Sequence, residues 1–289
     1  EVIGIYHIKY RGEIEKNKVK YYFTGLGRWQ LLLPIQFNRT VQQLKPDVVI
    51  VHGLIFSWQV IMLRWQMGKH VKIIAQHHAE RPLRDIRQYI QRWADRYIMA
   101  YLFSSLDLGR LWVEKKQIRN ESKIKVVMGT SSTFYPLDKK LARTTVNVPD
   151  EKIFLWVGRL NPNKDPLIVV KAFNRFAKLH ADVSLFMIYS TVDQELLNLM
   201  RVEGLTDKIH FVGPVNHDQL QCWYNSADFI VSSSHYEGSG IAVCEAMSCG
   251  CIPIVTNIPS FVMMTDNGNI GLLYPAGHED SLFNELEKS

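Results

Sequence analysis

The chain has 289 residues, of which 47% are hydrophobic and 21% are charged, and these values exclude collagenous, low-complexity and disordered proteins. At about one domain per 100–200 residues, the length predicts two domains that each bury a core. The net charge of +6 is unevenly spread, because residues 1–148 carry 25 basic and 11 acidic side chains and residues 149–289 carry 9 and 17. Halves of opposite charge indicate two domains with different partners.

The first half contains several predicted strands. Residues 1–8 have the pattern of a strand inside a sheet, and residues 48–51, 71–75 and 125–128 are apolar runs typical of buried parallel strands. The most membrane-like stretch, 48–63, has only 16 residues, fewer than the roughly 20 that a membrane helix needs, so we predict a strand followed by a helix. We expect no signal peptide and a cytoplasmic location.

Residues 82–102 have the apolar spacing of an amphipathic helix. Its apolar positions are Leu83, Ile86, Ile90, Trp93, Tyr97 and Tyr101, and its basic ones are Arg84, Arg87, Arg92 and Arg96. A core helix with a solvated basic face explains this pattern most simply. The alternative is docking to an anionic membrane, as a peripheral protein on its inner face. No nucleic-acid recognition motif accompanies the basic charge, so nucleic acid is not an expected partner.

The second half alternates strands and helices, which predicts a parallel α/β sheet. The expected strands are 153–157, 184–189, 209–212, 229–232 and 252–256, and the expected helices lie near 193–203, 217–226 and 240–249. A further helix is expected to begin with Asp165 as cap and Pro166 at its first position. Residues 136–150, with two prolines and few apolar residues, are the expected linker, so we place the domains at 1–148 and 149–289.

The four cysteines lie in the second half and match no common zinc pattern. They are Cys222, Cys244, Cys249 and Cys251. We therefore expect no metal and interpret the cysteines as reduced, small apolar residues.

The first candidate for chemistry is the loop after the strand that ends at Gly158. Arg159 and Lys164 in this loop place two cations where the carboxyl ends of strands bind ligands, which suits a diphosphate. The alternative is an ordinary solvated loop, because Arg and Lys are common there.

The second candidate is a glycine-containing loop that leads into an apolar helix. Gly238 and Gly240 allow close backbone approach, and the amides of Ser239, Gly240 and Ile241 at a helix start favour an anion. Two acids flank them. Glu245 lies inside the helix, where a carboxylate can accept hydrogen bonds from adjacent sugar hydroxyls, and Glu237 lies in the loop. The alternative is that both are surface residues.

These residues resemble a known family. Glu237 and Glu245, with seven residues between them, are similar to the E-x7-E motif of the retaining glycosyltransferase family 4, whose fold is GT-B. Gly158, Arg159 and Lys164 resemble its phosphate-binding loop. Lesser matches follow in the family's order at 211–213, 227–234 and 245–255. The implied fold is α/β, with two Rossmann-like parallel-sheet domains facing a cleft.

In the first half the resemblance is positional. Residues 94–98, 123–127 and 134–136 resemble stretches of the family, and His77 and His78 end a strand where the family often has a histidine near the donor sugar. On the residues alone, a structural role is the simpler interpretation of either histidine. Ser239 departs from the family's usual Phe, and the family's first strand and helix and its closing helices have no counterpart, which suggests a fragment.

The resemblance implies transfer of a sugar from a nucleotide diphosphate sugar to a glycan or lipid-linked acceptor, with retention and with neither metal nor cofactor. Arg159 and Lys164 would stabilise the leaving diphosphate, Glu237 would contact the donor sugar, and Glu245 would bind the ribose. Gly213 and Pro214 would lie beside the base. A nucleotide-sugar epimerase of the same fold and a non-catalytic sugar-nucleotide-binding module are the alternatives.

Overall fold

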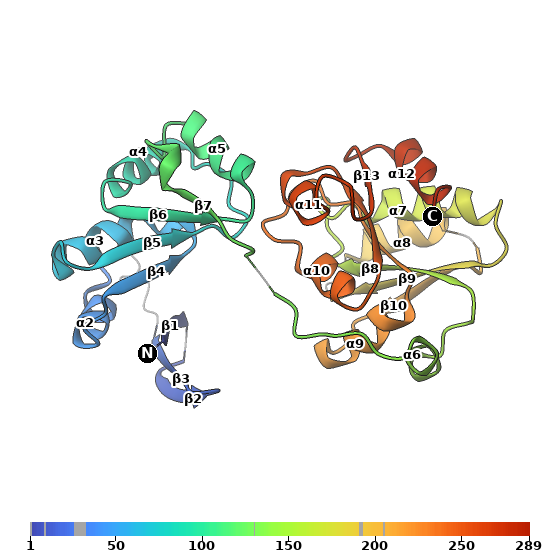
Figure 1. The fold of residues 1–289 in the computed structure, drawn as a ribbon, viewed down its shortest axis with the longest axis horizontal. Helices are drawn as coiled ribbons and strands as arrows, with labels where there is room; N and C mark the ends of the chain where they lie inside the picture. Colours follow the sequence, from blue (N-terminus) through green and yellow to red (C-terminus); the bar gives the residue numbers. More distant parts are fainter. Residues whose placement is uncertain (1, 9, 26–32, 130, 191–192, 205) are drawn as a thin grey trace. The chain divides into compact units, whose positions relative to one another are not determined.

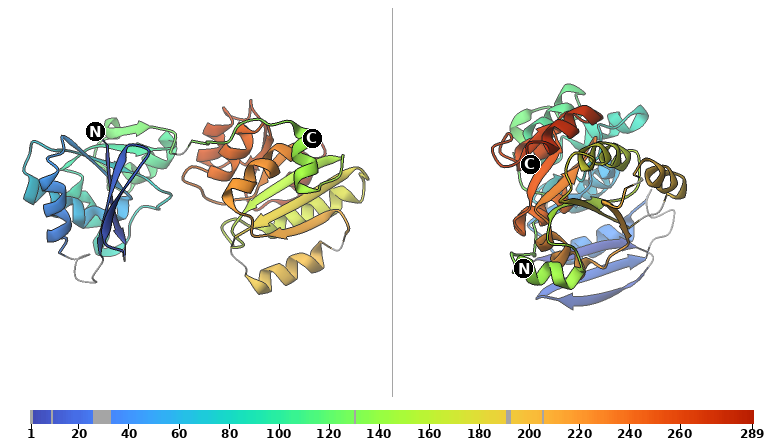
Figure 2. Two further views of the ribbon diagram at one scale, coloured as in Figure 1. Left: turned by 90° about the horizontal axis from the view of Figure 1, so that it is seen from below. Right: turned by 90° about the vertical axis from the view of Figure 1, so that its right-hand side faces the viewer.

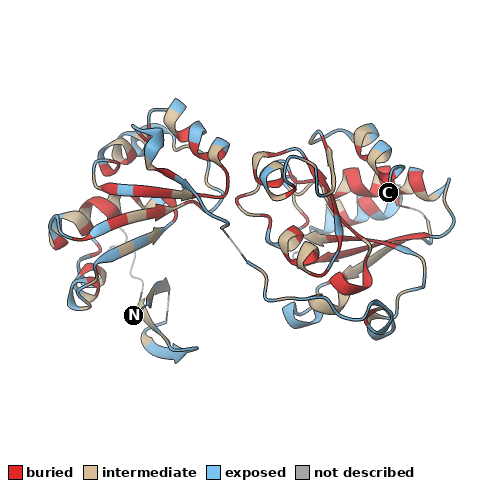
Figure 3. Ribbon diagram, in the orientation of Figure 1, coloured by how far each residue is buried: buried red, intermediate tan, exposed pale blue. Residues whose placement is uncertain are grey.

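The computed structural model describes residues 2–8, 10–25, 33–129, 131–190, 193–204 and 206–289. The chain forms two compact units, Glu1–Val126 (unit 1) and Val127–Ser289 (unit 2), each with parallel strands and helices (Figure 1). In unit 1 the buried residues of the main sheet lie chiefly in its two middle strands, and in unit 2 they run along most of the strands; helices of both units bury their inner sides (Figure 3). Unit 1 has 22 basic and 10 acidic residues and unit 2 has 12 and 18, so the opposite charges belong to separate units.

Unit 1 contains a four-stranded parallel sheet and a smaller separate one. The main sheet has the order β4-β5-β6-β7, with β4 Val48–His52, β5 Lys72–Gln76, β6 Ile98–Phe103 and β7 Ile124–Val126. Its helices are α2 Ile35–Gln43, α3 Ser57–Met67, α4 Asp85–Ala94 and α5 Leu106–Glu114, with short 3-10 turns at Leu54–Phe56 and Glu121–Lys123. The small sheet, dark blue in Figure 2, has the order β1-β3-β2, from β1 Ile3–Ile8, β2 Gly12–Lys16 and β3 Val19–Gly25.

The single helix predicted over residues 82–102 is wrong. Helix α4 ends at Ala94, and Ile98–Phe103 is strand β6, which pairs with both β5 and β7. The sequence of β6 is apolar throughout, and the strand is paired on both sides, as is typical of a buried inner strand of a parallel sheet. The helical spacing of Tyr97 and Tyr101 was therefore coincidental.

Unit 2 contains a six-stranded parallel sheet of order β10-β9-β8-β11-β12-β13. Its strands are β8 Lys152–Gly158, β9 Val183–Tyr189, β10 Ile209–Gly213, β11 Phe229–Ser232, β12 Ile252–Thr256 and β13 Leu272–Tyr274. Its helices are α6 Lys139–Val146, α7 Pro166–Ala177, α8 Gln194–Glu203, α9 His217–Ser226, α10 Ile241–Ser248, α11 Pro259–Met264 and α12 Glu279–Leu286. The predicted alternation of strands and helices is confirmed.

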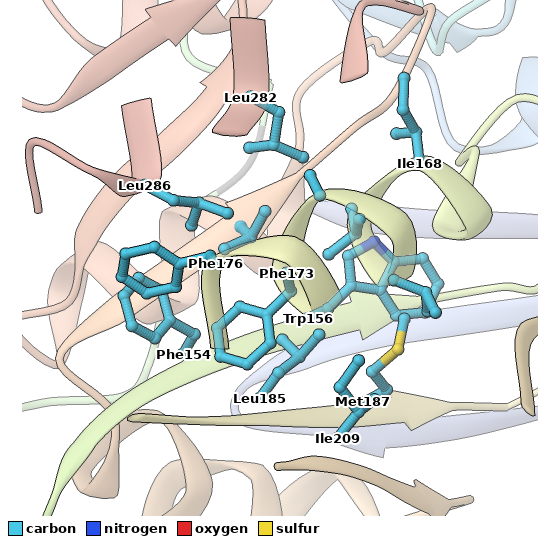
Figure 4. Packing of buried hydrophobic residues seen from close by; sticks show 14 of the residues in the cluster. Phe154, Trp156, Ile168, Phe173, Phe176, Leu185, Met187, Ile209, Leu282 and Leu286 are labelled. Carbon is cyan, nitrogen blue, oxygen red and sulfur yellow. The ribbon is translucent and has the colours of Figure 1, made fainter. Parts of the chain in front are cut away.

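The core of unit 2 lies on both faces of this sheet. Phe154 and Trp156 of β8 join one apolar cluster, and Ile153 and Leu155 join the other, because successive side chains of a strand point to opposite faces. In the first cluster Phe154 packs edge-on against Phe173 of α7 (Figure 4). Since both faces are covered, the chemistry of this unit is confined to the ends of the strands.

The segment expected to be a linker, 136–150, contains helix α6, which packs on unit 2. Asp138 caps the helix by accepting a hydrogen bond from the amide of Leu141 at 2.7 Å. Lys139 and Arg143 form ion pairs of 2.7 and 2.9 Å with Asp228. Unit 2 begins at Val127, earlier than the predicted boundary after residue 148. The segment has few apolar residues, and its polar contacts with Asp228 attach it to the rest of unit 2.

Candidate functional site

The strand order of unit 2 reverses beside β8, which has β9 on one side and β11 on the other. In sheets of this kind the loops that follow the two central strands diverge and leave room for a ligand. Here the loops after β8 and β11 are joined by hydrogen bonds. The amide of His235 donates to the carbonyl of Asn163 at 2.8 Å, and the Asn163 side chain donates to the carbonyl of Tyr236 at 2.9 Å. The loops of the two predicted motifs therefore lie side by side.

Lys164 and Glu237 meet at the centre of this site. The Lys164 Nζ forms an ion pair with Glu237 Oε1, and the Ser234 hydroxyl donates to the same oxygen at 2.7 Å. The two charged side chains are 20% and 14% exposed, so they are accessible but shielded from bulk water. Both line a small pocket that also includes Gly240 and Phe261. The pocket thus brings a cation and a carboxylate to the start of helix α10.

Arg159 provides a second cation at the end of β8. It follows Gly158, the last residue of the strand, and its side chain is exposed. Within the part of the chain that the structure describes, its guanidinium makes no hydrogen bond or ion pair. Arg159 is therefore available to an incoming anion, whereas Lys164 must first exchange Glu237 for it.

Gly240 is required by the turn that starts α10. Its φ of +60° lies in the left-handed region, and a Cβ at this position would lie 2.4 Å from the Phe261 ring. Ser239 precedes it, with its hydroxyl close to the backbone of Gly129. Because α10 begins at Ile241, the first amides of the helix have no acceptor within it and carry the positive end of its dipole.

Glu245 faces a different neighbour. It is only 6% exposed, and its two oxygens contact His217 Nε2 at 2.9 Å and the Tyr224 hydroxyl at 3.1 Å. Burial and the Glu245 charge raise the pKa of Tyr224, so this tyrosine remains a hydrogen-bond donor. His217 begins α9, directly after the loop that contains Pro214. Glu245 is thus joined to the loop that follows β10.

Gly213 ends β10 with a φ of +88°, and no heavy atom lies within 4 Å of the position that a Cβ would take. The backbone turn therefore favours glycine, although the space is open. The predicted residues form two groups, one of Lys164 and Glu237 with Arg159 nearby, and one of Glu245 with the end of β10.

Asp165 occupies the predicted N-cap position of α7, but its side chain does not cap the helix. Asp165 accepts no capping hydrogen bond from the helix and has a φ of +43°. Its carboxylate instead contacts the His235 imidazole at 2.9 Å, which helps to hold the two loops together. Pro166 occupies the first helical turn as expected.

The two candidate histidines of unit 1 have different environments. His77 is 4% exposed, stacks on Phe103 with ring centres 4.7 Å apart, and has its pKa lowered chiefly by burial. His78 is exposed, and its Nε2 lies 3.0 Å from Nδ1 of His52. His77 is thus placed in the core, and His78 at the surface.

Sequence reasoning missed His52. His52 is the last residue of β4, just as His77 and His78 directly follow β5. Partial burial lowers the pKa of His52, and the nearby His78 lowers it further. The sequence held a signal for this pairing, because histidines lie at the ends of two successive predicted strands, 48–51 and 71–75, and such strands are often neighbours in a sheet. The carboxylate of Glu80, also missed, accepts the amides of Leu54 and His78 at 3.1 and 2.6 Å and fastens the two loops.

The cysteines are free thiols, and burial raises the pKa of Cys249 and Cys251. Over the described ranges, no group of three or more His, Cys, Asp or Glu side chains is arranged to hold a metal ion. Nor does any helix of the described residues have the length and apolar character needed to cross a membrane.

Part of the sequence matches a known protein family. Residues 138–288 match the family described as glycosyl transferases group 1. The chain is 29% identical over 157 residues to D-inositol 3-phosphate glycosyltransferase 2 of Catenulispora acidiphila, which covers 50% of the chain and 36% of that protein. It is 29% identical over 160 residues to D-inositol 3-phosphate glycosyltransferase of Paenarthrobacter aurescens, covering 53% and 39%. The matched part is well under half the length of these relatives.

Solved structures share the fold at lower identity. Sucrose-phosphate synthase from Thermosynechococcus elongatus has a TM-score of 0.74 at 21% identity, over 96% of this chain and 75% of that one. Anabaena HepE in complex with UDP and glucose has a TM-score of 0.73 at 16% identity, over 93% and 76%. These likenesses confirm the predicted α/β fold class, GT-B.

Proposed function

The chain belongs to the glycosyl transferases group 1 family, and from this premise we propose that it transfers a sugar from a nucleotide diphosphate sugar to a glycan or lipid-linked acceptor. We further propose that the transfer retains the configuration of the anomeric carbon and needs no metal ion. In this proposal unit 2 binds the donor and unit 1 contributes to the acceptor.

One observation carries the proposal: Lys164 and Glu237 meet between the ends of β8 and β11, beside the start of α10. A diphosphate needs positive charge, and a reacting sugar needs a nearby carboxylate as its anomeric carbon becomes cationic. The small pocket presents both groups side by side.

The leaving diphosphate is the first charge that the site would stabilise. In the reaction, the bond from the anomeric carbon to the diphosphate oxygen breaks, the bond to the acceptor oxygen forms on the same face, and the acceptor proton moves to the diphosphate. Arg159, Lys164 and the amides at the start of α10 would stabilise the developing negative charge. A diphosphate carries more charge than Glu237 and would draw Lys164 away from it.

Glu237 would then be free to face the sugar. Freed from Lys164, its carboxylate would stabilise the oxocarbenium-like transition state. No second carboxylate is assigned as a nucleophile, so the proposal contains no covalent glycosyl intermediate. Ser239, at the start of α10, would contact the donor sugar where the family usually has Phe.

Glu245 would bind the ribose hydroxyls of the donor. Each carboxylate oxygen has two lone pairs, and His217 and Tyr224 occupy one on each oxygen. The remaining lone pairs can accept hydrogen bonds from two adjacent hydroxyls. The backbone around Gly213 and Pro214 would contact the base. For this reason the side chains of that loop do not reveal which nucleotide base is bound.

In unit 1, we assign His78 rather than His77 to contact with substrate. His78 is exposed at the end of β5, and His52 lies beside it. The buried His77 donates a hydrogen bond from Nε2 to the Glu80 carbonyl at 2.8 Å, which suits a positioning role for this loop.

Kinetics of two variants test the proposal. Lys164→Ala and Glu237→Gln should lower kcat by about 10²–10³ with the cognate donor, because each removes charge stabilisation in the transition state. The control is Lys178→Ala, an exposed lysine of the same unit. Retention is read from the anomeric coupling in the product, and metal independence from unchanged turnover in excess chelator.

Other outcomes would identify the alternatives. Donor binding without turnover, with any acceptor tested, would support a non-catalytic sugar-nucleotide-binding module. Interconversion of donor sugars in the absence of acceptor would support an epimerase. Either result would contradict transfer.

A further inference from the structure

Helix α4 of unit 1 turns its apolar side outward. Ile86, Tyr89 and Trp93 are 69%, 58% and 37% exposed, whereas the buried residues of the helix are Gln91 and Ala94. A helix that packs on a sheet ordinarily buries its large apolar residues and leaves amides in water. The arrangement in α4 is the reverse.

A polar network on the inner side fixes this orientation. The Gln91 amide accepts from the Ser57 hydroxyl at 2.7 Å and donates to the Tyr101 hydroxyl at 3.0 Å. The Tyr101 hydroxyl donates in turn to Asp95 at 3.0 Å. Because these buried groups would lose their partners if α4 rotated, the outward position of its aromatic residues is built into the fold.

The outward side of α4 joins neighbouring residues in one surface, which we call the aromatic–arginine face. Trp65 of α3 is 55% exposed, and its ring centre lies 5.6 Å from that of Trp93. A pocket beside it is lined entirely by arginines and aromatic residues. The face consists of Trp65, Ile86, Tyr89, Arg92, Trp93, Arg96 and Arg119.

The charge of this face is strongly positive. The Arg92 guanidinium lies 5.3 Å from the centre of the Tyr89 ring, and its Nε is buried without a hydrogen-bond partner. Among the residues that the structure describes, the Arg96 side chain has no hydrogen bond or ion pair. Arg119 is 3.7 Å from the buried Asp95, which Lys123 already contacts at 3.0 Å. The pocket therefore has guanidinium groups that an anion can bind.

We propose that the aromatic–arginine face docks on an anionic membrane, with a lipid phosphate in the pocket of Arg92, Arg96 and Arg119. Guanidinium groups bind phosphates with two hydrogen bonds, and Trp and Tyr side chains favour the boundary between lipid headgroups and acyl chains. Exposed basic residues nearby, Arg84, Arg87, Lys115 and Lys116, extend the complementarity to a negative surface. The proposal goes beyond sugar transfer and does not depend on it.

Sedimentation with lipid vesicles tests the proposal in the whole chain. We expect binding to vesicles of equal parts phosphatidylcholine and phosphatidylglycerol, and none to phosphatidylcholine alone. The double variant Tyr89→Ser, Arg96→Gln should bind the anionic vesicles about tenfold more weakly, since it removes one interfacial ring and one cation. The matched control is Leu199→Ser, Arg201→Gln, an exposed apolar and basic pair on α8 of unit 2.

A second measurement needs no variant. Brominated phosphatidylglycerol should quench the tryptophan fluorescence of the unaltered chain, because Trp65 and Trp93 would enter the headgroup region. Absence of binding to anionic vesicles would overturn the proposal, as would equal loss in both double variants or no loss in the first. Binding of a poly(U) RNA in place of vesicles would assign the face to a polyanion other than lipid.

Discussion

Each unit buries one carboxylate beneath a tyrosine, and the two carboxylates differ in what else surrounds them. Asp95 of unit 1 is fully buried and contacts Tyr101, Lys123 at 3.0 Å and Arg119 at 3.7 Å. Glu245 of unit 2 is 6% exposed and contacts Tyr224 and His217.

This difference separates a structural acid from one suited to a ligand. Lys123 and Arg119, which are always charged, neutralise Asp95. Together with the Tyr101 hydrogen bond, these contacts link the end of α4 to β6 and to the segment before β7. Glu245 has no lysine or arginine contact among the described residues, and it lies in the helix that starts at the donor pocket. A carboxylate with lone pairs to spare can still accept hydrogen bonds from a sugar.

The largest effect is expected for the structural acid. Asp95→Ala should lower the free energy of unfolding of unit 1 by about 3 kcal/mol, because Tyr101 and Lys123 lose their buried acceptor. Denaturant unfolding measures this change, with donor binding to unit 2 as the internal control. A loss of less than about 1 kcal/mol would contradict the structural role of Asp95.

Glu245→Gln should weaken ligand binding and leave stability nearly unchanged, the opposite of the effect expected for Asp95→Ala. We expect nucleotide-sugar binding about thirtyfold weaker, equivalent to about 2 kcal/mol, because the hydrogen bonds to ribose lose their charge. Unfolding of unit 2 should change by less than about 1 kcal/mol, since the amide oxygen still accepts from Tyr224. Calorimetric titration and denaturant unfolding are the two measurements. Strong destabilisation with unchanged binding would make Glu245 a second structural acid.

The tyrosines provide a finer comparison. The Tyr101 hydroxyl donates to Asp95 and accepts from Gln91, whereas the Tyr224 hydroxyl donates to Glu245. Tyr101→Phe should therefore destabilise unit 1 by about 2 kcal/mol, and Tyr224→Phe should destabilise unit 2 by about 1 kcal/mol. Thermal unfolding of both variants measures the difference, and the reverse order would contradict it.

The smallest effect concerns pH and unit 1. Partial burial and His78 lower the pKa of His52 below its usual 6.5. At pH values between the lowered pKa and about 6.5, the unfolded chain therefore binds more protons than the folded one. Stability is then complete above about pH 6.5 and is lost as pH falls through the lowered pKa. His52→Asn should make unfolding of unit 1 less dependent on pH between about 5 and 7. An unchanged dependence would contradict this assignment.

The sequence predicted unit 2 better than unit 1 for a physical reason. Strands such as β11 and β12 are short apolar runs bounded by turns, and the structure has them at the predicted residues. In unit 1 the apolar spacing of 82–102 was misleading, because Gln91 is buried by a network whose partners, Ser57 and Tyr101, are distant in sequence or lie in a strand.

The site was predictable where it depends on local patterns. The loops of Lys164 and Glu237 were identified from motifs, and the strand order brings them together. The contacts of Glu245 with His217 and Tyr224, the loss of the Asp165 cap to His235, and the pairing of His52 with His78 join distant segments. No local pattern in one sequence records such contacts.

Thermal unfolding of the chain with UDP-, GDP- and ADP-sugars tests the central claim most directly. A ligand that binds the folded state raises the melting temperature, so at least one of these donors should do so. The shift should be lost in Glu245→Ala and reduced in Lys164→Ala, and it should persist in Lys178→Ala. No shift with any donor, or equal shifts in all three variants, would contradict a donor site in unit 2.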